Sequence, residues 1–492
     1  MKTLNNELLM EQKTIVKRDA KKNKIIQFGG GNFLRAFVDY YLNLLNENDL
    51  MDSGVTLIQA IPQDTPILEK MQQQDYNYTL IERGMEKGET ISRSSIIDII
   101  TDVINPYDDM NAYLNCAKSE ELRFVVSNTT EAGIVYDGNC KFEDAPQNSF
   151  PGKVARFLYE RYAHFKGDKT KGLVFLPCEL IDNNGTTLKE IILKHISDWN
   201  LEDDFKTWVL ESNYFTNTLV DRIVPGFPRN EISDLTEKLG YVDYFIVTSE
   251  VFNFWVIEGP TWLQEELPFH KLGLYVVWTK DATPYKSRKV RILNGGHTST
   301  VLSAYICGFK TVGEMMNCES FNSLLTNILY DEVIPTLDLP KDDLTNFAAS
   351  VFDRFKNPFI EHFLMDISLN STSKYKVRVV PSIVKYYEIN KKIPVCLTTS
   401  FAGLITFYRG QLPNGKKIEL KDDEKAINYF QENWKKYNKG EVSLKEVVTL
   451  FASNAEMFGA DLSKLDGFVD AVTKHTEGFL NKKALEVIEN VL

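Results

Sequence analysis

The segment PYKSRKVRILNGGHTSTVLSAY contains a lysine, an asparagine and a histidine at positions i, i+5 and i+8: Lys289, Asn294 and His297. At about 100° per residue, one face of a helix could present all three side chains. Together they supply what the reduction of a carbonyl group needs. A lysine can act as general acid, an amide N–H can polarise the carbonyl oxygen, and an imidazole can orient a hydroxyl group. The same spacing is also typical of a polar face at the start of a helix, so the pattern alone leaves both interpretations open.

A glycine-rich turn follows the apolar run KIIQF and precedes a helical stretch. Glycines in this position let the backbone turn sharply and approach a pyrophosphate, which the N–H groups at the helix start can bind. We therefore predict a dinucleotide site formed by Gly29, Gly30, Gly31, Asn32, Phe33 and Arg35. Leu34 takes the place of the third glycine of G-x-G-x-x-G, and a turn without a ligand is the alternative.

Three further residues are candidates for cofactor contacts. Asp64 follows the second apolar run and could bind the adenosine ribose, and the absence of a nearby arginine cluster favours NAD over NADP. Asn128 and Thr130 come at the expected carboxyl end of the next strand, where nucleotides lie in such folds. Capping of a turn is the alternative for both of these residues.

Strands and helices that could position these residues alternate in the first half of the chain. Near-continuous apolar runs, bounded by polar or turn residues, lie at 24–28, 55–61, 123–128, 172–177 and 244–249. Such runs are typical of strands that crossover helices bury on both faces. Apolar residues repeat at three and four positions between the first two runs, which predicts one amphipathic helix over 32–48. The fold class is therefore α/β, with a doubly wound Rossmann-type sheet.

The pattern changes after about residue 283, where helical periodicity predominates and strand-like runs nearly vanish. Prolines at 284, 335, 340, 358 and 381 fall between the helical segments. Helices tend to end just before a proline. We therefore predict a Rossmann-type NAD-binding domain over residues 1–283 and a mostly α-helical substrate domain over residues 284–492.

Composition narrows the classes of function. The 492 residues include 56 Lys and Arg against 68 Asp and Glu, and the net charge of −12 argues against nucleic acid as a partner. The 6 cysteines lack C-x-x-C spacing and the 6 histidines are scattered, so we expect reduced thiols and no metal site. The charged N-terminus does not resemble a signal peptide, and no apolar run could span a bilayer. We expect a cytoplasmic protein without a membrane partner, and the oligomeric state stays open.

Similarity to a known family is carried by five segments: QFGGGNFLRAF, LVFLPCELIDNNG, TNTLVDRIVPG, EVFNFWVIEGP and KVRILNGGHTS. In this order they resemble the mannitol dehydrogenase family of polyol-specific long-chain dehydrogenases, from about residue 24 through the last third of the chain. The resemblance implies a Rossmann-type domain, a helical C-terminal domain and a site without a metal. It also implies that Lys289 is the acid/base, that Asn294 holds the carbonyl or alkoxide oxygen and that His297 contacts substrate hydroxyls.

Two departures from the mannitol dehydrogenases bear on the substrate. Their Cys-Asp-Asn is here Cys178-Glu179-Leu180, and Leu180 cannot supply a second oxygen-holding amide. Either Asn184 or another group supplies it, or the oxygen-holding site is smaller. Lys286 stands where those enzymes have a glutamate. A cation at this position suits a substrate with a carboxylate, and a solvated lysine is the alternative.

The resemblance points to three more residues. Asp221 in TNTLVDRIVPG matches an aspartate near the family's site, where it could orient neighbouring groups, and a structural ion pair or cap is the alternative. Lys374 and Arg378 match a segment that lines the family's substrate pocket and could bind a carboxylate. For these two residues an ordinary basic pair on the surface is the alternative.

The activity that the resemblance implies is NAD-dependent interconversion of D-tagaturonate and D-altronate, with a small hexuronate or aldonate as substrate. The segment RFKNPFIEHFLMDISLNSTSKYKVRVVPS is most similar to family members that act on hexuronates. Reduction of fructuronate to D-mannonate is the nearest alternative, and mannitol oxidation is less favoured because of Leu180 and Lys286. A dinucleotide-binding sensor that kept the fold and lost the chemistry is the alternative from another class.

Overall fold

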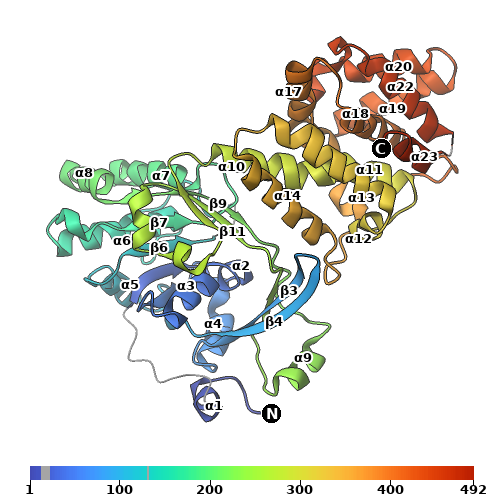
Figure 1. Cartoon of the computed structure of the whole chain (residues 1–492). Helices are drawn as coiled ribbons and strands as arrows, with labels where there is room; N and C mark the ends of the chain where they lie inside the picture. The colour runs from blue at the N-terminus through green and yellow to red at the C-terminus, as the bar shows by residue number, and fades with distance from the viewer. Residues whose placement is uncertain (13–22, 130–131, 482) are drawn as a thin grey trace. The chain divides into compact units, whose positions relative to one another are not determined.

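The computed structural model describes residues 1–12, 23–129, 132–481 and 483–492, and of residues 64–66 the backbone alone. The chain divides into two compact units, and Figure 1 labels many of their elements. The first unit consists of Met1–Arg83 and Ile91–Ala282. The second consists of Gly84–Thr90 and Thr283–Leu492.

A six-stranded parallel sheet forms the centre of the first unit, with the strand order β5-β2-β1-β6-β7-β8. Its strands are β1 (Asn23–Phe28), β2 (Gly54–Ile58), β5 (Ile100–Ile104), β6 (Phe124–Ser127), β7 (Val174–Pro177) and β8 (Tyr214–Phe215). Numbered within this sheet, the order is the 3-2-1-4-5-6 of Rossmann folds. The predicted doubly wound sheet is confirmed, and its strand order reverses between β1 and β6, where ligands bind in such folds.

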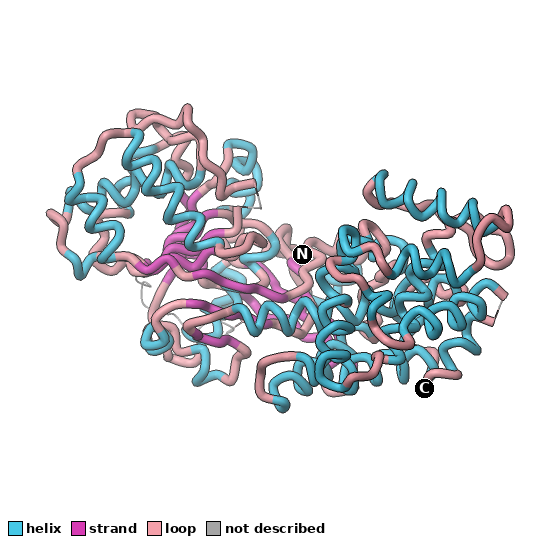
Figure 2. The backbone as a smooth tube through the Cα atoms, turned by 90° about the horizontal axis from the view of Figure 1, so that it is seen from above, coloured by secondary structure: helices cyan, strands magenta, loops and turns pink. Residues whose placement is uncertain are grey.

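Helices cover both faces of this sheet (Figure 2). Helices α3 (Val38–Glu47) and α4 (Thr65–Gln72) lie on one face, and α5 (Met110–Cys116), α6 (Phe150–His164), α7 (Asn184–Asp198) and α8 (Asp203–Ser212) on the other. Ile25 and Ile26 are consecutive residues of β1 that pack into the two different cores. Alternate residues of a strand point to opposite faces, so a strand buried on both sides is apolar nearly throughout.

The helix predicted over 32–48 is broken into α2 (Asn32–Arg35) and α3. Phe37 at the break has φ −127° and ψ −80°. The two carbonyl groups just before Phe37 accept hydrogen bonds from distant side chains, Arg35 O from Tyr78 and Ala36 O from Arg222. Because these carbonyls are directed at other partners, a continuous helical hydrogen-bond ladder cannot form through the corner.

The apolar run at 244–249 was predicted as a strand of the main sheet, and this part of the prediction is wrong. It forms β10 (Val247–Ser249), which pairs with β3 (Tyr78–Glu86) in a separate sheet completed by β4 (Glu89–Ile97). A third sheet contains β9 (Asn217–Asp221), β11 (Phe254–Glu258) and β12 (Val276–Thr279). An apolar run indicates that a strand is buried, but it carries no information on which strand it pairs with.

The second unit is helical, as the sequence predicted. Its elements from Thr283 are α10 (Thr283–Arg288), η5 (Lys289–Asn294), α11 (Gly295–Ile306), α12 (Val312–Met316), α13 (Glu319–Asn327), η6 (Ile328–Val333), η7 (Ile334–Thr336), α14 (Lys341–Phe355), α15 (Leu364–Ile367), α16 (Ser371–Arg378), α17 (Val380–Asn390), α18 (Val395–Phe407), α19 (Glu424–Asn438), α20 (Leu444–Ala452), α21 (Ala455–Phe458), η8 (Leu462–Lys464), α22 (Phe468–Leu480) and α23 (Ala484–Glu489). Almost every residue of α18 is buried, and α18 packs against α11 and α22. This helix forms the core of the unit.

A buried carboxyl group lies behind the glycine turn. Asp39 in the first turn of α3 is fully buried, and its Oδ2 accepts hydrogen bonds from Tyr78 Oη (3.2 Å) and Gln27 Nε2 (3.4 Å). The same Gln27 amide donates to Gly29 O at 3.2 Å. Burial raises the pKa of Asp39 to about 7, and the hydrogen bonds from Gln27 and Tyr78 only partly offset it. The carboxyl therefore holds its proton up to near neutral pH and belongs to the support of the turn.

We predict that Asp39→Asn makes the free energy of unfolding less sensitive to pH. The folded state holds the Asp39 proton up to about pH 7, whereas the unfolded chain loses it near the ordinary pKa. The stability that this group contributes is therefore complete at low pH and falls as the pH rises through about 7. An amide cannot ionise, so the variant should gain up to about 3 kcal/mol relative to wild type between about pH 5 and pH 8.

Urea unfolding at the two pH values measures this difference. The exposed Asp52 provides the matched control, because Asp52→Asn removes a carboxylate that is not buried. An Asp39→Asn variant with the same pH dependence as wild type would contradict the prediction.

Candidate functional site

A cavity of about 600 Å³ lies at the carboxyl ends of β1, β2 and β6, beside the point where the strand order reverses. Its size is that of a site for a cofactor-sized molecule. It is lined by Gly29, Gly30, Gly31, Leu57, Gln59, Ala60, Ile61, Ile67, Leu68, Asn128, Thr129, Ala132, Gly133, Val135, Tyr136, Asp137, Asn148, Ser149 and Phe150. The lining contains the three glycines and Asn128 among the residues that the sequence predicted to bind a cofactor.

The geometry of the turn explains two of its glycines. Gly29 has φ +102°, and a Cβ there would lie 3.2 Å from Asn128 O, so the turn closely approaches the loop after β6. A Cβ on Gly30 would lie 2.9 Å from Leu57 Cδ1, whereas one on Gly31 would meet no atom within 4 Å. The turn thus leaves open space over Gly31 between tightly packed neighbours. This open cradle fits the close approach of a pyrophosphate.

The other residues of the predicted turn site lie outside the cavity lining. Arg35 is buried, and its guanidinium donates to Phe245 O (2.6 Å), Asn32 Oδ1 (2.7 Å) and Gly30 O (3.1 Å). The Phe33 ring stacks on Phe37 at a centroid distance of 5.1 Å. Arg35 therefore supports the turn from behind, and contact of Asn32, Phe33 and Arg35 with a cofactor stays a prediction.

The two remaining cofactor candidates are Asp64 and Thr130. Asp64 ends the short helix η1 (Pro62–Asp64), and its side chain lies outside the described part of the structure, as does the whole of Thr130. Gln59, which the sequence analysis missed, follows β2 directly and lines the cavity, with Nε2 donating to Ile61 O at 2.9 Å. Ser149, also missed, lines the cavity and caps α6 by accepting from Gly152 N. A serine just before a proline-containing helix start is a local signal that could have found it.

Leu180 and Asn184 follow β7 and bear on the predicted oxygen-holding amide. The Leu180 side chain is 66% exposed. Asn184 is fully buried, where its Nδ2 donates to Pro177 O (3.0 Å) and its Oδ1 accepts from Thr218 N (2.9 Å). These bonds join β7 to β9. They give the Asn184 amide a structural role, and its contact with substrate stays a prediction.

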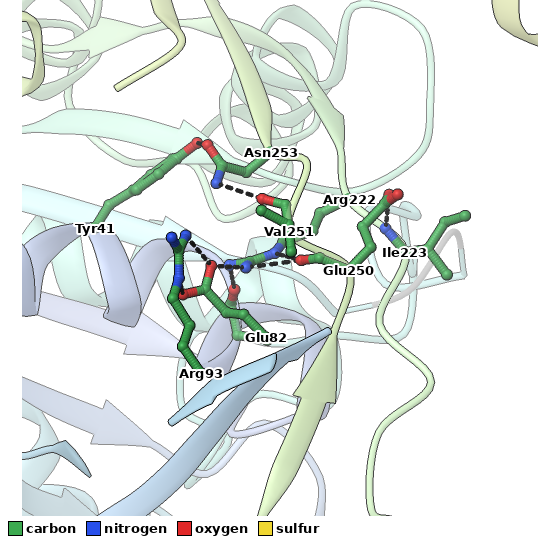
Figure 3. A network of polar contacts seen from close by, with 9 residues as sticks. Tyr41, Glu82, Arg93, Arg222, Ile223, Glu250, Val251 and Asn253 are labelled. Atoms are coloured by element: carbon green, nitrogen blue, oxygen red, sulfur yellow. Dashed lines mark hydrogen bonds and ion pairs between the residues drawn. The ribbon is translucent and has the colours of Figure 1, made fainter. Parts of the chain in front are cut away.

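Arg222, next to Asp221 in the chain, belongs to a buried polar network that Figure 3 shows. Arg222 Nη2 lies 2.5 Å from Glu82 Oε1, and Arg222 Nε donates to Glu250 O at 3.1 Å. The second Glu82 oxygen accepts from Arg93 Nε at 2.7 Å. Asp221 itself is buried at the end of β9, opposite Phe254 of β11. The ion pair next to Asp221 is formed by Arg222 and Glu82, and both the substrate role of Asp221 and its structural alternative stay predictions.

Lys289 and Asn294 bound a π-helical turn in the second unit, continuous with α10 and α11. Gly295 N donates to Val290 O, five residues back. The wider turn brings position i+5 closer around the axis to position i than the regular helix assumed from the sequence does. A Cβ on Gly295 would lie 3.1 Å from Arg378 O, so this glycine lets the end of α16 approach the turn.

His297 lies one turn further along α11, against two aromatic rings. Its ring stacks on Phe355 at a centroid distance of 3.8 Å and meets His362 edge-on at 5.0 Å. Burial, and after it the neighbouring His362, lowers the pKa of His297 well below its usual value. Its Nδ1 is buried without a hydrogen-bond partner among the described residues. A neutral imidazole in this position can donate from one nitrogen and accept at the other.

Cationic side chains surround this histidine. Arg378 Nη1 donates to Thr298 Oγ1 at 3.3 Å, next to His297 in the chain, and Lys374 Nζ donates to Ile367 O at 3.0 Å. Burial lowers the pKa of Arg378, and burial together with Arg378 lowers that of Lys374. Lys286 is exposed on α10 and Lys289 is half-buried. The second unit therefore brings His297 together with Lys374 and Arg378, two of the predicted carboxylate ligands.

No group of three or more His, Cys, Asp or Glu side chains in the described ranges could hold a metal ion. Within the same ranges, every helix is too short or too polar to cross a lipid bilayer.

Comparison with known proteins gives matches along nearly the whole chain. Two family profiles match it, the mannitol dehydrogenase Rossmann domain over residues 23–271 and the mannitol dehydrogenase C-terminal domain over residues 281–480. An altronate oxidoreductase from Klebsiella pneumoniae is 43% identical over 473 residues, which are 95% of this chain and 97% of that protein.

Two solved structures share the fold. A D-sorbitol dehydrogenase in substrate-free form has a TM-score of 0.79 at 22% identity, covering 99% of this chain and 100% of that one. The mannitol 2-dehydrogenase of Pseudomonas fluorescens, solved with NAD and D-mannitol, has a TM-score of 0.64 at 21% identity, with 99% of each chain covered.

We predict that Gly29→Ala lowers the free energy of unfolding by about 1–3 kcal/mol, because it forces a side chain into a left-handed conformation. The new methyl group would also press on the Asn128 carbonyl. Gly31→Ala is the matched control, since Gly31 has φ −66° and open space around it. Denaturant unfolding of both variants checks this, and equal losses would show that the turn does not require glycine at position 29.

Proposed function

Because this chain belongs to the mannitol dehydrogenase family, we propose that it is an NAD-dependent oxidoreductase that interconverts D-tagaturonate and D-altronate. The observation that carries the proposal is the 43% sequence identity between this chain and an altronate oxidoreductase, which extends over nearly the whole of both chains. The cavity at the glycine turn and the Lys289, Asn294 and His297 side chains supply the matching chemistry. We assign cofactor binding to residues 1–283 and substrate binding to residues 284–492, in a cytoplasmic protein.

The residues of the second unit provide the acid–base chemistry in this proposal. When bound, the reduced dinucleotide supplies hydride to the ketone carbon. Lys289 donates a proton to the carbonyl oxygen during reduction and accepts it back during oxidation. Asn294 donates an amide N–H to the same oxygen and so stabilises the negative charge that develops there. The neutral His297 holds substrate hydroxyls as donor and acceptor.

The cations around His297 are the proposed ligands of the uronate carboxylate. Arg378 lies beside Thr298, and Lys374 lies one turn before Arg378 on α16. A guanidinium and an ammonium bind a carboxylate through charge-assisted hydrogen bonds. Lys286 is the third candidate, three residues before Lys289.

The test is a direct comparison of substrates with the purified protein. Oxidation of NADH is followed spectroscopically with tagaturonate, fructuronate and fructose, and NADPH is compared with NADH. Preference for tagaturonate with NADH supports the proposal. Preference for fructuronate keeps the mechanism and changes the substrate, because the two ketouronates differ only in hydroxyl configuration, whereas fructose as best substrate favours a polyol enzyme. Turnover of none of them, with the dinucleotide bound, favours the sensor.

We predict that Lys289→Ala lowers kcat by about 10²–10⁴-fold, which is the usual contribution of a general acid. Affinity for NADH should change little, because Lys289 lies outside the unit that contains the cavity. Steady-state kinetics and NADH titration separate the two effects. Near-normal turnover would contradict the acid/base assignment.

We predict that Arg378→Gln raises KM for uronates by about tenfold or more and affects uncharged ketoses much less, because it removes a charged partner of the carboxylate. Lys374→Gln and Lys286→Gln test the other two candidates in the same way. Lys376 on the same helix is exposed and donates to Glu456 O, so Lys376→Gln is the matched control. Equal losses on uronates and ketoses would reject a carboxylate role.

A further inference from the structure

We propose that Glu179 makes the dinucleotide site bind the oxidised cofactor more tightly than the reduced one. The inference rests on the proposed function in one respect, namely that a nicotinamide dinucleotide occupies the cavity beside the glycine turn. The sequence did not point to Glu179 as a site residue. It was named only as the middle residue of Cys178-Glu179-Leu180, which replaces Cys-Asp-Asn.

The Glu179 carboxylate reaches from the end of β7 to the wall of the cavity. The residue is 2% exposed, and its Oε1 accepts from Thr129 N (2.9 Å) and Thr129 Oγ1 (3.0 Å). Its Oε2 accepts from Ser127 Oγ at 3.1 Å. Thr129 lines the cavity, so a single residue separates this carboxylate from the space where a cofactor would lie.

The three donors to this carboxylate are all neutral groups. Burial raises the pKa of Glu179, and the groups that offset it are hydrogen-bond donors, without a lysine or arginine among those described. The charge of Glu179 is also one cause of the raised pKa of the adjacent Cys178 thiol, although burial is the larger cause. A buried carboxylate that lacks a cation acts strongly on nearby charges, because little solvent screens it.

The position of Glu179 selects one end of the cofactor. In an open α/β sheet a dinucleotide lies across the point where the strand order reverses, with one nucleotide over each half of the sheet. The adenosine ribose lies at the end of the second strand in such folds, which is the Gln59 side of the cavity here. The β6 and β7 side, with Thr129 and Glu179, then takes the nicotinamide. The nicotinamide ring is positively charged when oxidised and neutral when reduced, so the carboxylate favours the oxidised form.

Titrations of NAD⁺ and NADH by isothermal calorimetry test this inference without any turnover. In Glu179→Gln we expect the Kd of NAD⁺ to rise about tenfold and that of NADH to change by less than about threefold. Glu179→Asp keeps the charge, so it should keep the preference even if both affinities fall.

An unchanged ratio of the two Kd values in Glu179→Gln would overturn the inference and reduce Glu179 to a support of the loop. If Glu179→Gln does not fold, the pH dependence of wild-type binding replaces it. The two Kd values should converge at low pH, where Glu179 is protonated, and a ratio independent of pH would overturn the inference. Failure of the wild type to bind either dinucleotide would instead overturn the proposed function.

Discussion

The buried ion pair between Arg222 and Glu82 joins parts of the first unit that no local interaction could hold together (Figure 3). Neither side chain is accessible to solvent beyond 1%, and Arg93 neutralises the second oxygen of Glu82. The Arg222 guanidinium also donates to the carbonyl groups of Ala36 and Glu250. One side chain thereby links the hairpin β3–β4, the loop after β10 and the corner between α2 and α3. Losing one member of a buried ion pair typically lowers the free energy of unfolding by about 3–5 kcal/mol. The corner that follows the glycine turn therefore depends on a distant part of the sequence.

The parallel sheet was predictable because its signals are local. A strand buried on two faces is apolar nearly throughout, and a glycine turn followed by a helix marks the start of a βαβ unit. The run at 244–249 shows the limit of such signals. It is as apolar as the others, yet it pairs with β3, a strand that the sequence analysis did not identify, because pairing depends on long-range packing.

Side-chain directions at the site were predictable only where the backbone dictates them. The backbone at position 29 is left-handed and therefore requires a glycine, and a glycine in a turn can be recognised in the sequence. Arg35 looks like an anion ligand in the sequence, but its partner Phe245 O is 210 residues away, which no local pattern encodes. The Asn184 amide is hydrogen-bonded to Thr218 of β9. The Glu179 carboxylate, just after β7, accepts a hydrogen bond from Thr129 N, just after β6. In each case tertiary contacts decide whether a polar side chain faces the cavity or the protein.

The π-helical turn at Lys289–Asn294 amounts to one extra residue inserted into an otherwise regular helix. The wider turn absorbs this residue, so α11 continues α10 with nearly the phase of a regular helix that is one residue shorter. Narrowing the turn to α-helical geometry without shortening the chain would rotate everything after it by about 100°. His297 would then no longer keep its present angular relation to Lys289 around the axis. That relation thus depends on the width of this turn as well as on the number of residues in it.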